Sequence, residues 1–107
     1  MSKKGDIILI PFPFTDLKSS KVRPALVIGS QGGDVIVLFI TSAYKGSSEV
    51  TVTVAKSDIN GLKDDSRIIV SKIATLDKKM ILGKLGVVDS RHLLQINTKL
   101  KKFFKMD

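Results

Sequence analysis

A small, strongly curved antiparallel β-barrel with one helix at its C-terminal end is the fold class that the sequence predicts. The 107 residues are 43% apolar and 26% charged, which suits one globular domain, residues 1–107, with a modest core. About six short apolar runs are separated by turns or loops instead of helices, so the spacing of parallel βαβ units is missing. A helical period of apolar residues appears only near the end of the chain.

Apolar, β-branched runs in the first half of the chain predict four strands. They are residues 7–10, 25–28, 35–40 and 50–54. The second and third runs flank a glycine-containing turn at residues 31–34, which predicts a hairpin. The fourth run alternates strictly between Val and Thr, so we expect a strand with one face in water.

The second half of the chain predicts two further strands. One lies within residues 66–73, with its apolar part at 67–70, and the other is the glycine-thinned run 82–88. Between them, Thr75 is expected to cap a short helical turn over residues 76–80.

The last element is predicted to be an amphipathic helix that Asp89 or Ser90 caps. Its expected core-facing side is formed by Leu93, Ile96, Leu100, Phe103 and Phe104. Its lysines, of which the last is Lys105, either form a solvated face or attract phosphates without specificity. His92 is expected to be a surface residue.

Charge and cysteine content limit the classes of function. The net charge is +8, from 18 basic and 10 acidic residues, and such an excess favours a polyanionic partner, although it can also serve solubility alone. Without cysteine and with one histidine, disulfides and thiolate chemistry are excluded, and neither a metal site nor a cofactor is expected. The first apolar run ends at Pro11, too short for a signal peptide or a membrane span, so we expect a cytoplasmic protein without a membrane partner.

Cleavage of a phosphodiester needs a base, an acid and cations or donors that stabilise charge on phosphorus. With one histidine and no acidic cluster at metal-ligand spacing, such a site has to use Arg, Lys, Thr, Ser or a lone Asp. Arg23 is the first candidate, because Pro24 favours an extended backbone there and a loop of roughly ten residues, 11–21, precedes it. A guanidinium at that strand entrance suits phosphate, with Lys21 as a neighbouring cation; the alternative is an ordinary solvated arginine.

Polar and aromatic side chains beside Arg23 are the other substrate-binding candidates. Thr41 and Ser42 end the third strand, where hydroxyls can hold a phosphate, although they are also common where strands stop. The long loop contributes Phe14 and Asp16. Phe12 and Phe14 either stack on unpaired bases or pin this loop to the barrel.

The order of these motifs is more specific than any one of them. They are Gly5-Asp6-Ile7, Lys21-Val22-Arg23-Pro24, Ile40-Thr41-Ser42, Gly61-Leu62-Lys63, Ser66-Arg67-Ile68-Ile69-Val70 and Thr75-Leu76-Asp77-Lys78. In this order the chain resembles the MazF/PemK family, the toxins of type II toxin–antitoxin systems, over nearly its whole length.

The resemblance implies an SH3-like barrel of the CcdB/PemK type with a C-terminal helix, usually as a homodimer. It implies metal-independent cleavage of single-stranded RNA (mRNA), often at short preferred sequences, and neutralisation by a cognate antitoxin with an acidic, extended tail. The family's arginine and threonine at the scissile phosphate correspond to Arg23 and Thr41. By this resemblance Arg23 stabilises charge and takes part in proton transfer, Thr41 positions the phosphate, and Ser42 is a weaker neighbour.

The chain departs from the family pattern at residues 71–74. Ser71 stands opposite an aspartate proposed as the catalytic base in one branch, Lys72 where glutamine is common, and Ala74 where arginine is frequent. Either the chain lacks that branch's mechanism and is slow, or Lys72 supplies a second cation at the phosphate.

Two other functions fit the same barrel. Gyrase-poisoning toxins are related in fold and do not cut RNA, so the chain could be a non-catalytic toxin that binds a protein target such as gyrase. The positive charge and the two loop phenylalanines also fit a plain basic nucleic-acid-binding module.

Overall fold

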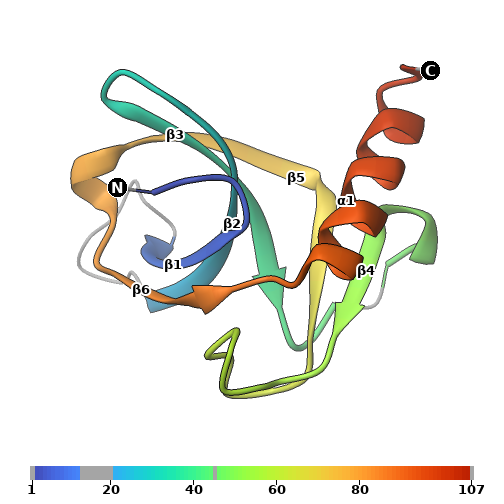
Figure 1. Cartoon of the computed structure of the whole chain (residues 1–107), viewed down its shortest axis with the longest axis horizontal. Coiled ribbons are helices and arrows are strands. Elements are labelled where there is room, and N and C mark those ends of the chain that lie inside the picture. The colour runs from blue at the N-terminus through green and yellow to red at the C-terminus, as the bar shows by residue number, and fades with distance from the viewer. Residues whose placement is uncertain (1, 13–20, 45, 107) are drawn as a thin grey trace.

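Six strands, two short 3-10 helices and one α-helix make up the part of the chain that the computed structural model describes, residues 2–12, 21–44 and 46–106 (Figure 1). The elements are β1 (Asp6–Phe12), β2 (Lys21–Gln31), β3 (Asp34–Thr41), η1 (Ser48–Val50), β4 (Thr51–Val54), β5 (Ser66–Asp77), η2 (Lys78–Met80), β6 (Gly83–Val87) and α1 (Ser90–Phe103). The mainly β prediction with a C-terminal helix is therefore confirmed.

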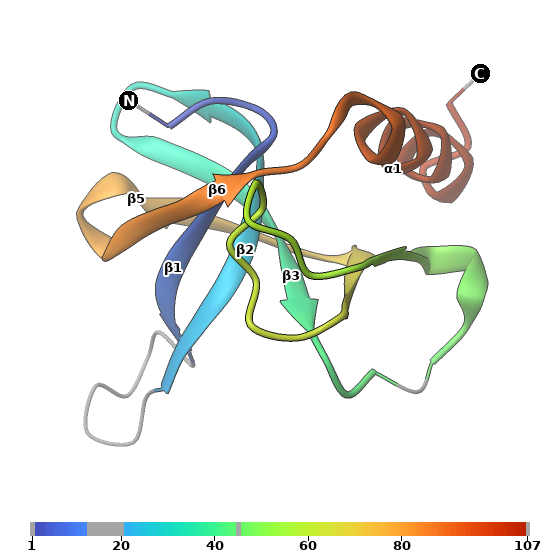
Figure 2. The ribbon, with the colours of Figure 1, turned by 60° about the horizontal axis from the view of Figure 1, so that its bottom comes forward.

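The strands form one antiparallel sheet in the order β4-β5-β3-β2-β1-β6. It curls into a half-barrel, with the long β5 crossing behind the others (Figures 1 and 2). A bulge bends β5: Leu38 of β3 pairs with Ile73, whereas the next residue, Phe39, pairs with Ile69. Three residues of β5, 70–72, are thus inserted, and such an insertion increases local twist and bending.

The segment between β4 and β5 covers the open side of the half-barrel. Within the described ranges β4 and β6 do not pair with each other, but the backbone N–H of Val87 donates to the carbonyl of Ile59 at 3.0 Å. The α-carbon of Gly86 lies so close to the Ile59 carbonyl that any side chain there would collide with it. Gly61, at a φ of +70°, approaches the Leu85 carbonyl in the same way.

The curled sheet buries side chains on both of its faces, which is why the early strands read as continuous apolar runs. One cluster consists of Ile7, Leu26, Leu38, Ile40, Val52, Val54, Leu62, Ile68, Val70, Val88 and Ile96. The other consists of Ile8, Ile10, Ala25, Val27, Val35, Val37 and Leu76. Helix α1 covers the first cluster through Ile96, with Leu93 and Leu100 beside it.

The predicted helical turn over residues 76–80 was wrong in its start and its cap. Thr75 lies in β5, opposite Ile36 of β3, and Leu76 is buried in the core. The turn is shorter, η2, and Asp77 caps it by accepting the backbone N–H of Lys79 at 2.8 Å. Pairing with β3 and burial of Leu76 outweigh the weak capping preference of a threonine.

Several strand boundaries also differ from the prediction, most of all in β2, which begins at Lys21 and ends at Gln31 instead of covering residues 25–28. β1 continues through Pro11 to Phe12, and this is tolerated because β6 pairs with β1 only as far as Leu9, leaving the proline beyond the doubly paired part. β4 starts at Thr51, which was expected on the wet face but is buried. The ammonium of Lys99 on α1 donates to the Thr51 carbonyl at 2.7 Å, so the helix lies over this residue.

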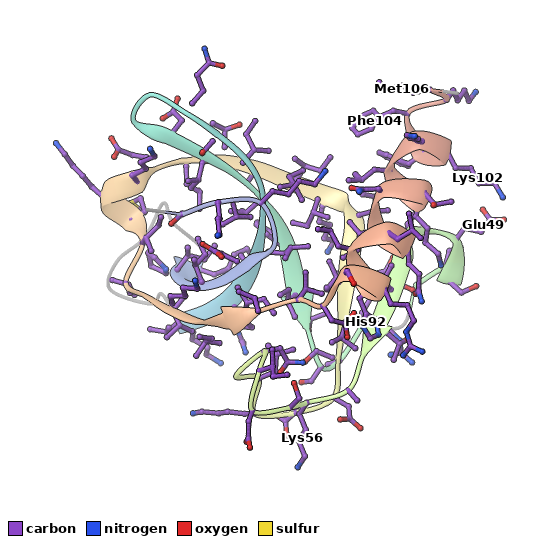
Figure 3. The ribbon with its side chains drawn as sticks, viewed as in Figure 1. Glu49, Lys56, His92, Lys102, Phe104 and Met106 are labelled. Atoms are coloured by element: carbon purple, nitrogen blue, oxygen red, sulfur yellow. The ribbon has the colours of Figure 1, made fainter. Side chains whose placement is uncertain are left out.

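The helix starts as predicted, but its last turn does not reach the core. Of the two possible caps it is Asp89 that accepts the backbone N–H of His92, at 2.8 Å. Phe103 and Phe104 were expected on the core side, but they are 44% and 51% exposed and their rings pack on each other. Figure 3 shows Phe104 and Met106 at the end of α1 that rises clear of the strands. None of the helices in the described ranges is long and apolar enough to cross a bilayer.

Candidate active site

Arg23 and Thr41 come together at one end of the sheet. β2 and β3 are neighbours, and Ala25 pairs with Phe39. Arg23 precedes Ala25 by two residues and Thr41 follows Phe39 by two, so an antiparallel register brings both to the same end. Both residues line the same two adjacent cavities.

The first cavity, here called the aromatic cavity, is lined by Phe12, Phe39 and Tyr44 together with Arg23 and Thr41, and has a volume of about 300 Å³. The rings of Phe12 and Phe39 meet edge to face, with centroids 5.1 Å apart. Phe12 therefore packs on the barrel while part of its ring stays accessible. The mixture of aromatic faces and cationic heads suits a nucleobase joined to a phosphate.

The second cavity, here called the polar cavity, lies on the other side of Arg23 and Thr41 and has a volume of about 350 Å³. Ser42, Lys63 and Asp64 supply its polar groups. Arg23, Pro24, Ile40 and Thr41 line both cavities and form the wall between them. A chain that occupied both cavities would thus pass directly over Arg23 and Thr41.

The polar groups of that wall are available to a ligand. The Arg23 side chain is exposed and forms no hydrogen bond or ion pair within the residues that the structure describes. Thr41 Oγ1 accepts the backbone N–H of Ala43 at 3.2 Å, which fixes the oxygen and leaves the hydroxyl hydrogen free to donate. A guanidinium with five donors beside a positioned hydroxyl can bind the non-bridging oxygens of a phosphate.

Lys72 lines the aromatic cavity because of the bulge in β5. It belongs to the three inserted residues, and its exposed side chain lies on the same cavity as Arg23. The structure thus brings together two of the predicted cations at one concave surface. Whether Lys72 acts as the second cation at the phosphate stays a prediction.

The remaining predicted site residues are distributed unevenly. Ser42 is exposed and lines the polar cavity. Lys21 is exposed at the start of β2, two residues before Arg23, but lines neither cavity. Phe14 and Asp16 lie outside the described residues. Among the described residues no three His, Cys, Asp or Glu side chains gather in a way that could hold a metal ion.

Sequence reasoning missed Tyr44, Lys63 and Asp64. Tyr44 was not named among the candidates, yet it lines the aromatic cavity, its carbonyl accepts from the guanidinium of Arg67 at 2.9 Å, and its ring lies directly against the α-carbon of Gly46. An aromatic residue just after the Thr-Ser pair was the available signal for it. Lys63 was named only as part of a family motif and Asp64 was not named at all, because both reach the site through the fold of the segment that covers the half-barrel.

His92 lines neither cavity and instead takes part in the start of α1 (Figure 3). Its Nδ1 lies 2.8 Å from Oδ1 of Asp89. The backbone N–H of His92, and secondly its side chain, hold the pKa of Asp89 below its usual value. The His92 side chain is only 16% exposed, so it is less accessible than the surface residue that was expected.

Comparison with known proteins supports the fold. An endoribonuclease from a mycobacterial species, solved with its cognate antitoxin, superposes with a TM-score of 0.81 at 19% identity, over 100% of this chain and 98% of its own. A chain of the MazE–MazF structure from Deinococcus radiodurans superposes with a TM-score of 0.78 at 20% identity, over 99% of this chain and 98% of its own. The Mycobacterium tuberculosis toxin MazF-mt6 superposes with a TM-score of 0.76 at 20% identity, over 95% of this chain and 98% of its own.

Sequence comparison extends this likeness to the family. No curated protein matches the sequence. Residues 3–104 match the model of the PemK-like, MazF-like toxins, which covers nearly the whole chain. The chain therefore belongs to the family of PemK-like, MazF-like toxins of type II toxin–antitoxin systems.

Proposed function

We propose that this chain is a toxin endoribonuclease that cleaves single-stranded RNA, including mRNA, without a metal ion. The observation that carries the proposal is the position of Arg23 and Thr41 in the wall between two cavities. A strand bound across both cavities places one phosphate on this wall. The mycobacterial structural neighbour is itself an endoribonuclease.

In the proposed reaction the 2′-hydroxyl of RNA attacks the adjacent phosphorus. The bond from phosphorus to the 5′-oxygen breaks, so the products are a 2′,3′-cyclic phosphate and a 5′-hydroxyl. The hydroxyl loses its proton and the leaving 5′-oxygen gains one. Arg23 binds the non-bridging oxygens, stabilises the charge that develops on them and takes part in the proton transfer, while the Thr41 hydroxyl positions the phosphate.

The first test is cleavage of a long, mixed-sequence RNA by the purified protein in EDTA. We expect discrete fragments from the wild type and a loss of about 10²–10³-fold for Arg23→Ala, the size found when one donor to a developing oxyanion is removed. Arg23→Lys is expected to stay impaired, because an ammonium lacks the bidentate fork. Arg91→Ala, which removes an exposed arginine at the start of α1, is the matched control.

The outcomes separate the alternatives. Fragments that appear only after a divalent metal is added would overturn the metal-free part of the proposal. RNA that stays intact with and without metal would overturn cleavage itself and favour a non-catalytic toxin or a basic binding module.

The proposal includes two protein partners, a second copy of the chain and an antitoxin with an acidic, extended tail. The net charge of +8 favours a negatively charged segment, and so do three cations at the cavities that form no ion pair among the described residues, Arg23, Lys63 and Lys72. We expect poly-glutamate to inhibit cleavage at low salt and to inhibit it much less at high salt, because salt screens the attraction between the charges. Sedimentation at rising concentration tests the homodimer, and a monomer throughout would contradict it.

A further inference from the structure

The polar cavity contains a carboxylate next to the proposed phosphate site. Asp64 lines this cavity together with Arg23 and Thr41, and its side chain is exposed. Within the described part of the chain the Asp64 carboxylate forms no hydrogen bond and no ion pair, either with Arg23 or with Lys63 beside it. A negative charge at this place repels the phosphates of the RNA backbone. Asp64 can therefore strengthen RNA binding only by contacting another part of the RNA.

The backbone around Asp64 is held in place by hydrogen bonds, although its side chain has no partner in the described part of the chain. The Ser66 hydroxyl donates to the Asp64 carbonyl at 2.8 Å. The next carboxylate, Asp65, accepts the backbone N–H of Lys56 at 2.9 Å and so has a structural partner. On the other side, the side chain of Asn60 accepts the backbone N–H of Leu62 at 3.0 Å. Asp64 is therefore an acceptor on an anchored segment, without a partner among the described residues, as specific recognition requires.

The chemistry of the cavity matches the edge of a nucleobase. Its volume of about 350 Å³ is within the range of small-molecule pockets. A carboxylate accepts hydrogen bonds from amino groups such as N4 of cytosine. Ser42 can donate or accept and Lys63 can only donate, so these two can bind the ring nitrogens and carbonyls next to the amino group. Lys63 also offsets the charge of Asp64.

We propose that Asp64 is a specificity-determining residue that selects, at one position beside the cut, a base with an amino group over uracil. Cytosine, adenine and guanine each offer amino hydrogens to the carboxylate, whereas uracil presents carbonyl oxygens in their place. The inference rests on the proposed function, because Arg23 and Thr41 are taken to hold the phosphate while the polar cavity holds a neighbouring base.

The test compares wild type, Asp64→Asn and Asp34→Asn in two measurements. Asp34 is an exposed aspartate at the opposite end of β3 from Thr41 and lines neither cavity, so it controls for charge. In the first measurement, all cleavage sites in a mixed-sequence RNA are mapped. We expect Asp64→Asn to admit uracil at one position beside the cut and to lower the preference for amino bases there by about tenfold or more, and Asp34→Asn to cut as the wild type does.

The second measurement does not depend on cleavage. Binding of short 2′-O-methyl oligocytidine and oligouridine, which cannot be cut by 2′-hydroxyl attack, is followed by fluorescence anisotropy. We expect wild type and Asp34→Asn to prefer cytosine and Asp64→Asn to lose that preference.

The outcomes keep the two proposals apart. If the wild type does not cut RNA, the proposed function fails, and binding still decides on Asp64. If the wild type cuts and Asp64→Asn keeps the same base preference in both measurements, the inference is overturned. A uniform loss of cutting at every site, with unchanged cytosine preference in binding, would also overturn it and would assign Asp64 to the chemical step.

Discussion

The ammonium of Lys84 lies 3.3 Å from Oδ1 of Asp6, a carboxylate that is 1% exposed. The other oxygen, Oδ2, accepts the backbone N–H of Lys3 at 3.0 Å. Oδ1 forms no hydrogen bond among the described residues, so the ion pair with Lys84 is the interaction that offsets the free-energy cost of burying this oxygen. The pair ties the start of β1 to β6, where Ile8 and Lys84 are in register.

We expect Lys84→Met to lower the free energy of unfolding by about 1–2 kcal/mol, because it leaves the Asp6 carboxylate buried without a counter-charge. The expected loss in the free energy of unfolding is no larger, because Lys84 is half exposed and water screens the ion pair. Urea denaturation of Lys84→Met, Asp6→Asn and the double variant measures the coupling. A coupling free energy of zero would mean that the pair contributes nothing to stability.

The contact between β6 and the segment that covers the half-barrel gives a steric prediction. A Cβ at Gly86 would collide with the Ile59 carbonyl, whereas one at Gly83, in the same strand, would meet no atom within 4 Å. We expect Gly86→Ala to destabilise the protein by about 1–3 kcal/mol and Gly83→Ala to change stability by less than about 1 kcal/mol. Thermal unfolding of both variants checks this, and equal effects would contradict the close approach.

The alignment of Arg23 with Thr41 was only partly accessible from the sequence. The turn at residues 31–34 predicts that Gln31 pairs with Asp34, as it does. Extending that register along the hairpin would place Arg23 opposite Ser42. The register shifts by one residue between Val27 and Gly29, and this bulge brings Arg23 to the level of Thr41 instead.

Predictions from local sequence patterns were wrong or incomplete where contacts between residues far apart in the sequence determine the structure. Strands were predicted because apolar β-branched runs report burial directly. The end of β5 was missed because pairing of Thr75 with β3 depends on a partner about forty residues away in the sequence. Asp64 and Lys63 were missed for the same reason, since they reach the polar cavity only after their segment has folded against β6.

Lys72 lines the aromatic cavity and stands where glutamine is common in the family, so its substitution tests the effect of this difference. We expect Lys72→Gln, which introduces the residue common in the family, to lower cleavage about tenfold and to make the salt dependence of RNA binding shallower by about one unit of slope, because one phosphate contact is lost. Lys79→Gln, at an exposed lysine of η2 that lines neither cavity, is the control. Unchanged or faster cleavage by Lys72→Gln would show that the lysine contributes nothing to the reaction.

The cap of α1 gives a dependence on pH. The backbone N–H of His92, then its side chain, lower the pKa of Asp89 from its usual 3.8. As the pH falls, the unfolded state therefore takes up a proton on Asp89 before the folded state does. The stabilisation by the charged cap is fully present above the usual pKa of 3.8, and it is lost as the pH falls through the lower pKa of the folded state. Asp89→Asn keeps a cap without the charge. We expect its Tm to lie below that of the wild type at neutral pH and the difference to vanish in acid; a constant difference would contradict the charge effect.

The two ends of α1 differ in what they contribute to the fold. Ile96 is fully buried in the core, whereas Phe104 is half exposed at the free end of the helix (Figure 3). We expect Ile96→Ala to cost about 2–5 kcal/mol, because it leaves a cavity, and Phe104→Ala to cost less than about 1 kcal/mol, because water already reaches the ring. Urea denaturation at two protein concentrations measures both. If Phe104→Ala were as costly as Ile96→Ala, and its cost fell on dilution, the ring would be buried against a second chain in solution, and the end of α1 would belong to an interface rather than to the surface of the monomer.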